Sequence, residues 1–453
     1  MGAACSCKDH FSFSLKKDDK SEIQIHYTTT TDRKESADNN NSQKKEKGSS
    51  DEEINEEEEE IKDLPVPDNQ KSEFQISKEQ QNEGFTYLPF QTKNKECVTL
   101  TKHLLTKKIS TYLKDSFLDF TLILSQLQQG FIQIQDRISR RHFYYTGEKA
   151  RDNKLLLDDC CQLFEDVLRE SELCCVTYCI KRDKLEKYIG ENSSNAKYVI
   201  MFTGLDNQVD PENNCGSLFA IWKRNTTKFR PLSEKEDILQ SCSSIIASGY
   251  CMYGQCMNLI LAINTDVNGF SYDVSQKEFI LTHPKIKAAQ RTGILSVDTS
   301  KESGWEPPIK IFINRKYQKK DKKLSLRYTG SLVADAHRTL LYGGILMYPL
   351  TNPNSEGDVS LIEAFILGYI FEKSWGRASQ GEGGSVTQMK LYNLQQKTQF
   401  YCGTSAEVVE LENVYLSIAR RQSINKSIAS RFSSNQSIGL NGSLDLSVKS
   451  VHS

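Results

Sequence analysis

The sequence predicts a layered fold of α-helices and β-strands, in the α+β or α/β class. Short apolar runs alternate with segments of helical period through the middle of the chain, and such interleaving is typical of layered folds. The runs are "KYVIMF", "GSLFAIWK", "MNLILAI", "EFILTH" and "IKIFINR". With 453 residues, 38% of them hydrophobic, the chain is long enough for one large domain or two ordinary ones.

One helix is predicted in detail from the stretch "YTGSLVADAHRTLLYGGILMYP". Ser331 is a suitable N-cap, and Leu332, Ala336 and Leu340 recur at the spacing of one helix face. Gly343 supplies a C-terminal stop. The apolar residues "ILMY" that follow predict a strand directly after the helix.

The two ends of the chain differ in composition from its middle. Residues 1–92 include the tract "ADNNNSQKKEKGSSDEEINEEEEE", which has too few apolar residues to offset the entropy of ordering, and we expect this extension to be disordered. The serine-rich tail, residues 417–453, is expected to be disordered as well. In that tail, Arg420 and Arg421 precede Ser423 in an R-R-x-S pattern that a basophilic kinase could phosphorylate.

The first residues, "MGAACSCK", match the pattern for N-myristoylation at Gly2. Cys5 and Cys7 add thiols that could be palmitoylated. Since one acyl chain binds membranes only marginally and a second makes attachment durable, the pattern predicts attachment to the cytoplasmic face of a membrane. The alternative is a chance match to a short pattern.

Charge and composition exclude several other classes of protein. The formal net charge of −1 gives no global basic field, so we expect no nucleic-acid partner. The longest apolar runs are much shorter than a membrane span. Thirteen cysteines without a secretory signal or zinc-ligand spacing indicate reduced thiols in a cytoplasmic protein.

The stretch around Ser331 closely resembles the "G-S-x-V-A-D-x-H-R-T-L-x-Y-G-G-I-x-x-Y-P" segment of class I fructose-1,6-bisphosphatases. "TLTKHL", "ASGYCMYGQCMNLILAINTDVNGFSYD" and "SLIEAFILGYIFEKSWGRAS" resemble further segments of that family. The resemblance implies a sugar-phosphatase fold of stacked αβαβα layers, with a metal-site half at residues 93–290 and a sugar-phosphate-binding half at residues 291–416. It also implies a tetramer and hydrolysis of the 1-phosphate with Mg²⁺ held by carboxylates.

The resemblance places the family's metal ligands at positions that are only partly retained. Asp206 and Glu363 match metal carboxylates, but Thr203 replaces an aspartate, and Lys181 and Arg182 replace a pair of glutamates. Mg²⁺ requires oxygen ligands, mostly carboxylates, so a reversal of charge at two positions should greatly weaken its binding. We therefore expect an incomplete, weak metal site, with Mg²⁺ as a cofactor only if the protein is an active enzyme.

The resemblance also identifies a catalytic candidate and a set of substrate-binding candidates. Asp158 matches the aspartate that activates water in the family. Asn314, Arg327, Tyr328 and Tyr348 match groups that bind the sugar and its second phosphate. A guanidinium group flanked by phenols is a suitable clamp for a phosphate, because all of these groups donate hydrogen bonds.

Two functions remain open from the sequence. The favoured one is a catalytically impaired homologue, tethered to a membrane, that binds a sugar bisphosphate or serves as a scaffold or partner subunit in a homo- or hetero-tetramer. In it, Lys181 and Arg182 would act as fixed cations beside the phosphate, or would turn outward into solvent. The alternative is an active Mg²⁺-dependent phosphatase in which Asp158, Asp183, Asp206 and Glu363 form a rebuilt site.

Overall fold

A computed structural model of the chain describes residues 97–106, 117–141, 149–188, 196–206, 214–227, 230–318, 324–351, 357–382 and 384–439. Gly2, Cys5, Cys7 and the acid-rich tract lie outside these residues. Within them, no helix is both long and apolar enough to span a membrane. The cysteines of the described ranges are free thiols, and most of them are buried.

The larger of the two main sheets has eight strands in the order β2-β1-β3-β4-β5-β6-β7-β8. In it β1 and β3 pair in parallel, and the other neighbouring pairs of these eight strands are antiparallel. The strands are β1 (Cys174–Cys179), β2 (Lys184–Lys187), β3 (Tyr198–Thr203), β4 (Cys215–Lys223), β5 (Ile245–Tyr253), β6 (Asn258–Ile263), β7 (Asp266–Asp273) and β8 (Glu278–His283).

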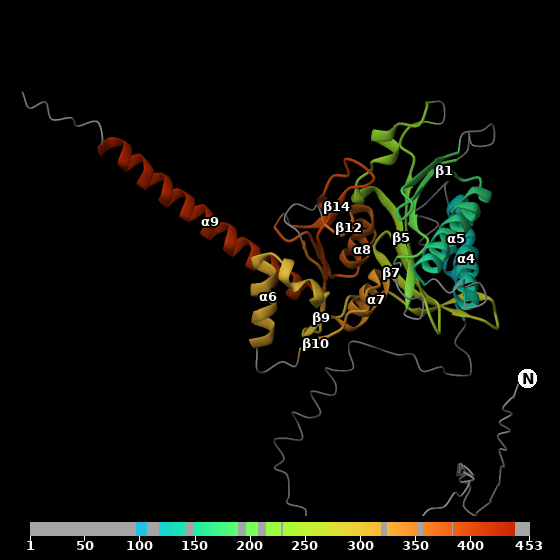
Figure 1. Ribbon diagram of the computed structural model, residues 1–453. Helices are drawn as coiled ribbons and strands as arrows, with labels where there is room; N and C mark the ends of the chain where they lie inside the picture. Colours follow the sequence, from blue (N-terminus) through green and yellow to red (C-terminus); the bar gives the residue numbers. More distant parts are fainter. Residues whose placement is uncertain are drawn as a thin grey trace, which may run out of the picture. The chain divides into compact units, whose positions relative to one another are not determined.

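Helices cover both faces of this sheet (Figure 1). On one face, α4 (Phe117–Arg140) and α5 (Lys149–Glu170) bury an apolar core against the strands, and α2 (Leu100–Leu104) packs beside β8. On the other face lie α7 (Leu332–Tyr342) and α8 (Leu361–Lys373). Helix α8 contacts strands of both sheets and lies in the layer between them, and its residues are therefore buried on all sides.

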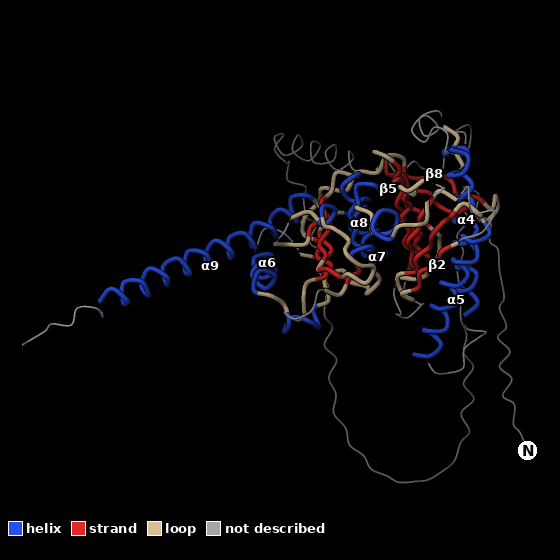
Figure 2. Tube along the Cα trace, turned by 90° about the horizontal axis from the view of Figure 1, so that it is seen from above, coloured by secondary structure: helices blue, strands red, loops and turns tan. Residues whose placement is uncertain are grey.

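The second sheet has five strands in the order β10-β9-β11-β15-β13. Its strands are β9 (Ile294–Ser296), β10 (Ser325–Leu326), β11 (Ile345–Tyr348), β13 (Arg377–Ser379) and β15 (Phe400–Gly403), while β12 (Val359–Ser360) and β14 (Lys397–Thr398) pair separately. Beyond it, α6 (Pro307–Gln318) packs on α9 (Ser405–Gly439). Figure 2 shows the resulting sequence of layers, which confirms the predicted αβαβα stack.

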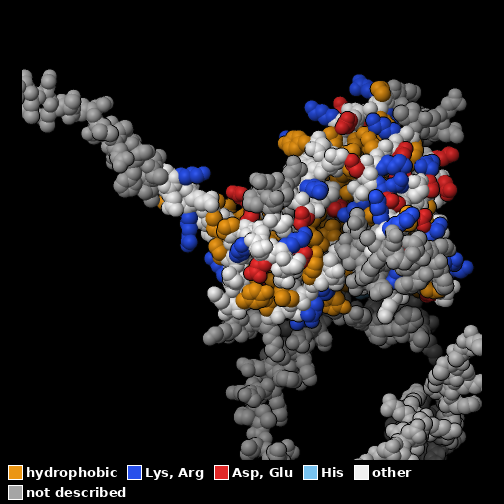
Figure 3. Space-filling model, in the orientation of Figure 1, with side chains coloured by type: hydrophobic (Ala, Val, Ile, Leu, Met, Phe, Trp, Pro, Cys, Tyr) orange, Lys and Arg blue, Asp and Glu red, His pale blue; other side chains and the backbone are white. Residues whose placement is uncertain are grey.

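Short helical segments occur in the connections: η4 (Glu234–Ile238), η5 (Cys242–Ser244), η6 (Thr299–Gly304) and η7 (Val386–Gln388). The predicted helix after Ser331 is α7. The Ser331 side chain accepts a hydrogen bond from the amide of Ala334, and Gly343 has a φ of 85° at the helix end. On the face shown in Figure 3, acidic and basic side chains are interspersed, as the near-zero net charge suggests.

Two expectations about secondary structure are wrong. The run "IKIFINR" is part of helix α6 rather than a strand, because Ile309, Phe312, Ile313 and Lys316 are buried at helical spacing after two prolines. The tail predicted to be disordered from residue 417 is helical as far as Gly439. No glycine or proline interrupts the sequence between Gly403 and Gly439, so the helix continues past the layered core.

Candidate functional site

Asp206 follows strand β3, whose six residues are all buried, and the side chain of Asp206 is itself 5% exposed. Both of its carboxylate oxygens are used. Oδ1 accepts a hydrogen bond from the amide of Gly216 at 2.9 Å, and Oδ2 accepts from the Ser331 hydroxyl at 2.7 Å and the Val333 amide at 2.8 Å. Asp206 therefore joins the end of β3 to β4 and to the first turn of α7.

The carboxylate of Asp206 also has a shifted pKa. Burial raises the pKa, and the hydrogen bonds from Ser331, Val333 and Gly216 and the charge of Lys181 oppose that rise only in part. Asp206 is thus a hydrogen-bond acceptor at the N-terminus of α7.

Lys181 points toward the second retained carboxylate. Its ammonium Nζ lies 2.7 Å from Oε1 of Glu363, and the two side chains are 28% and 3% exposed. The other oxygen of Glu363, Oε2, accepts a hydrogen bond from the amide of Ser360 in the capping box of α8. Burial opposes the charged ammonium, but attraction to Glu363, with a smaller part from Asp206, outweighs it, and the pKa of Lys181 is raised.

Arg182 points in a different direction from its neighbour. Its Nη1 donates to the amide oxygen of Gln162 at 3.0 Å and lies 3.6 Å from the carboxylate of Glu165, both on α5. Lys184 contacts the same Glu165 at 2.9 Å. These contacts bind the guanidinium group of Arg182 to α5, away from Glu363, and they give no support to its predicted role as a substrate-binding cation.

Thr203 and Asp183 also make contacts that stabilise the fold, whereas no described contact joins Asp158 to Asp206 or Glu363, and its catalytic role stays a prediction. The hydroxyl of Thr203 accepts from the amide of Leu218 at 3.0 Å. Asp183 adopts a left-handed conformation in the turn between β1 and β2, and it accepts hydrogen bonds from Tyr178 and Gln395. Asp158 is half-buried on α5, one turn before Gln162.

The described residues do not fit a magnesium ion. An ammonium group lies where a divalent cation would meet Glu363, and both oxygens of Asp206 already accept hydrogen bonds. Within the described ranges, no group of three or more His, Cys, Asp or Glu side chains is arranged to hold a metal. We therefore derive no chemical step through a metal at this position.

The sugar-phosphate end of the site has a different character. The rings of Tyr328 and Tyr348 lie 6.4 Å apart, edge to face, and Tyr328 is 39% exposed. Burial, with the charges of Asp298 and Asp335, raises the pKa of Tyr328 to about 12, so its phenol is a neutral donor at physiological pH. Arg327 is exposed beside it, and its Nη1 donates to the neighbouring carbonyl of Leu326.

Sequence reasoning missed two residues at this end. Lys301 forms an ion pair with Asp358 at 3.0 Å, and Asp298 acts electrostatically on Tyr328. Asn314 instead is exposed on α6, and no described contact joins it to Tyr328, so its assignment to this site stays a prediction. No local sequence pattern points to Lys301, because its partner lies 57 residues away and is brought near by tertiary packing.

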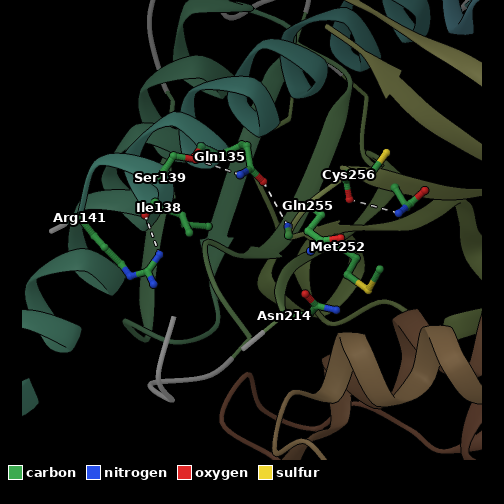
Figure 4. A pocket seen from close by; sticks show the side chains of 10 residues that line it. Gln135, Ile138, Ser139, Arg141, Asn214, Met252, Gln255 and Cys256 are labelled. Atoms are coloured by element: carbon green, nitrogen blue, oxygen red, sulfur yellow. Dashed lines mark hydrogen bonds between the residues drawn. The ribbon is translucent and has the colours of Figure 1, made fainter. Parts of the chain in front are cut away.

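A cavity of about 690 Å³ lies between the end of α4 and the turn from β5 to β6. Figure 4 shows that its polar side chains bond to nearby groups: Gln135 donates to Ser139 and accepts from the amide of Gly254, and Arg141 donates to the carbonyl of Ile138. The described residues that line it include no Asp, Glu, His or Lys. This lining therefore offers no carboxylate or imidazole for acid–base chemistry.

Comparisons with known proteins agree with this architecture. The model of "Fructose-1-6-bisphosphatase, N-terminal domain" matches residues 98–284, and that of the C-terminal domain matches residues 288–416. Cytosolic fructose-1,6-bisphosphatase from Brassica napus is 30% identical over 71% of this chain and 96% of its own. The chain belongs to the fructose-1,6-bisphosphatase family.

Other bisphosphatases are similar to the same extent. The cytosolic enzyme from a Saccharum hybrid is 29% identical over 72% of this chain and 97% of its own. Among solved structures, Leishmania major fructose-1,6-bisphosphatase in holo form has a TM-score of 0.61 at 28% identity, covering 71% of this chain and 99% of that one. The same enzyme in its T-state has a TM-score of 0.63. The matches to the family models thus lie within the layered core, and the N-terminal extension lies outside them.

Proposed function

We propose that this chain is a bisphosphatase-family protein that does not hydrolyse its ligand, in which the ammonium of Lys181 replaces a metal ion. The observation that carries the proposal is the ion pair between Lys181 and Glu363, beside a second carboxylate, Asp206, that already accepts three hydrogen bonds. A lysine ammonium neutralises a carboxylate. Unlike a divalent metal ion, it does not lower the pKa of a bound water molecule enough to make that water a nucleophile at neutral pH.

A phosphate-release assay with fructose-1,6-bisphosphate and excess Mg²⁺ tests this proposal. We expect turnover at least about a thousandfold below that of a family enzyme assayed alongside, the loss typical when groups that act as one unit are removed. The variant Lys181→Glu/Thr203→Asp should regain measurable Mg²⁺ binding. Robust metal-dependent release by the wild-type protein would instead support the alternative, an active phosphatase with a rebuilt site.

The second part of the proposal is that the chain retains binding of a sugar bisphosphate. Support comes from the neighbouring rings of Tyr328 and Tyr348 and from the exposed guanidinium of Arg327, the residue before Tyr328. Calorimetry with fructose-1,6-bisphosphate in the presence of EDTA should detect metal-free binding that weakens with salt and with Arg327→Met. If no binding is detected, the protein acts as a scaffold or as a partner subunit in a tetramer with other family members.

The third part is attachment to the cytoplasmic face of a membrane through acyl chains on Gly2, Cys5 and Cys7. Support comes from the sequence pattern alone, because these residues lie outside the described structure. The Gly2→Ala variant should move from the membrane fraction to the soluble fraction of cells. The proposal is wrong if the variant fractionates like the wild type.

A further inference from the structure

Trp375 has a backbone conformation that is costly for a bulky residue. It follows Ser374, the C-cap of α8, and has a φ of 68°, in the left-handed region where helices usually end on glycine. Its amide donates to the carbonyl of Glu372, and the amide of Gly376 donates to that of Phe371. The helix end thus requires a left-handed residue at 375, and a tryptophan fills that position.

The side chain of Trp375 gains little from burial in return. It is 67% exposed, whereas the chain's other two tryptophans, Trp222 and Trp305, are 0% and 4% exposed. Trp375 therefore carries the cost of a strained backbone without gaining from burial, and strained residues of this kind concentrate at functional sites.

The surroundings of Trp375 are cationic. The ammonium of Lys287 lies 4.3 Å from the centre of the indole ring, and Lys285, two residues earlier, is also exposed. Lys373 lies 5.2 Å from the ring centre of Tyr369. The adjacent carboxylate of Glu372 accepts hydrogen bonds from the hydroxyls of Ser385 and Thr387. We call Lys285, Lys287, Lys373 and Trp375 the Trp375 patch.

We propose that the Trp375 patch docks on a membrane surface that carries anionic lipids. An indole ring is stable at the level of lipid headgroups, where its apolar body and its N–H group are both satisfied, and lysines beside it are attracted to anionic headgroups. The choice of a lipid surface as the partner rests on the proposed acyl anchor. That anchor would hold the folded part near the bilayer, and the patch would orient it.

The test uses the full chain without acylation, so that its outcome does not depend on Gly2. Vesicles of phosphatidylcholine brominated in the acyl chains, with and without phosphatidylserine, are titrated while tryptophan fluorescence is recorded. Because only Trp375 is exposed among the three tryptophans, quenching by bromine reports its insertion. We expect quenching only with phosphatidylserine, and we expect it to decrease at high salt.

Trp375→Gly is the decisive variant, because it relieves the left-handed strain. It should unfold at the same or a higher temperature and yet lose vesicle binding, which is measured for all variants by sedimentation with the vesicles because this variant lacks the fluorescent reporter. Lys287→Glu should weaken binding at least about fivefold, because it removes one cation near the surface and adds an anion. Tyr392→Ser, at a 72% exposed aromatic residue outside the patch, is the matched control and should bind like the wild type.

Two outcomes would overturn the proposal: no quenching in the wild-type chain, or equal binding by Trp375→Gly. In either case the patch would have to serve a protein partner instead. The membrane anchor is tested separately, because Gly2→Ala affects fractionation of the acylated chain in cells and leaves the vesicle assay unchanged.

Discussion

The two ends of the candidate site differ in how many contacts their side chains make within the protein. At one end, Lys181, Glu363 and Asp206 use their charges and oxygens on each other and on nearby donors. At the other end, Arg327 and Tyr328 are exposed and make few contacts with the rest of the described structure. We call these the carboxylate end and the phenol end.

This difference indicates that the two ends of the site contribute unequally to the stability of the fold. At the carboxylate end, the groups that would hold a metal now stabilise the protein, as Asp206 does between β3 and α7. The side chains of the phenol end make fewer contacts, so substitutions there should disturb the fold less. The first end should therefore be sensitive to mutation in stability, and the second in binding.

The largest effect is expected from Asp206→Ala. The substitution leaves the buried amides of Gly216 and Val333 and the Ser331 hydroxyl without their acceptor, and it should cost about 3 kcal/mol in the free energy of unfolding. Asp358→Ala, at the phenol end, removes a half-exposed ion pair and should cost less than about 1 kcal/mol. Urea denaturation measures both, and equal costs would contradict the distinction between the two ends.

Some features of the carboxylate end could be predicted from the sequence, and others could not. The helix from Ser331 to Gly343 follows from local capping and spacing, and so does the position of Asp206 after a buried strand. The sequence could not show that Lys181 and Arg182 have different partners, because the side chains of neighbouring residues in a turn can point in different directions. The turn at Asp183, with its φ of 50°, and the carboxylates of Glu165 and Glu363 decide where each cation points.

The phenol end shows a second limit of sequence reasoning. Asn314 is assigned from a resemblance of short motifs, whereas the residues that act on Tyr328 and Asp358 include Asp298 and Lys301. These two belong to the short helix η6 and its cap, which has no strong periodic pattern. Ion pairs between residues distant in sequence are set by tertiary packing, and composition alone does not reveal them.

The second prediction uses pH to disturb both ends together. Helix α7 connects them, and on it burial lowers the pKa of His337 to about 4, with a small contribution from His283. As pH falls below about 6.5, the unfolded chain binds a proton that the folded chain does not bind until about pH 4, so stability is lost across this window. The loss should be about 2 to 3 kcal/mol by pH 4.

His337→Gln is the matched variant for this measurement, because it keeps a polar group near the Tyr250 hydroxyl, which lies 3.1 Å from Nδ1 of His337. Its unfolding free energy should vary less than that of the wild type between pH 6.5 and pH 4. An unchanged slope would show that other groups cause the acid sensitivity.

The third prediction separates Lys181 from Arg182. Lys181→Met leaves the carboxylate of Glu363 buried without its cation and should cost about 2 kcal/mol, below the value for a fully buried pair because Lys181 is 28% exposed. The double variant Lys181→Met/Glu363→Gln should recover most of this. Arg182→Met should cost less than about 1 kcal/mol, since its carboxylate partner Glu165 keeps the ammonium of Lys184.

The smallest effect on stability is expected at the phenol end, where Tyr328→Phe removes one hydroxyl from a 39% exposed ring. The unfolding free energy should change by less than about 0.5 kcal/mol. Binding of fructose-1,6-bisphosphate in EDTA should nevertheless weaken about five- to tenfold, because a donor to the phosphate is lost. Since the pKa of Tyr328 is about 12, the phenol stays protonated, and its contribution should be constant from pH 7 to about pH 10.

Calorimetry on Tyr342→Phe provides the control for this last variant, because Tyr342 is a 45% exposed tyrosine at the end of α7 and should not affect binding. If Tyr328→Phe binds as tightly as the wild type, the phenol end is not the ligand site. If it destabilises the fold by as much as Lys181→Met does, the phenol end contributes to stability no less than the carboxylate end. If Tyr328→Phe loses binding and keeps its stability, the phenol end binds the ligand and does not merely stabilise the fold.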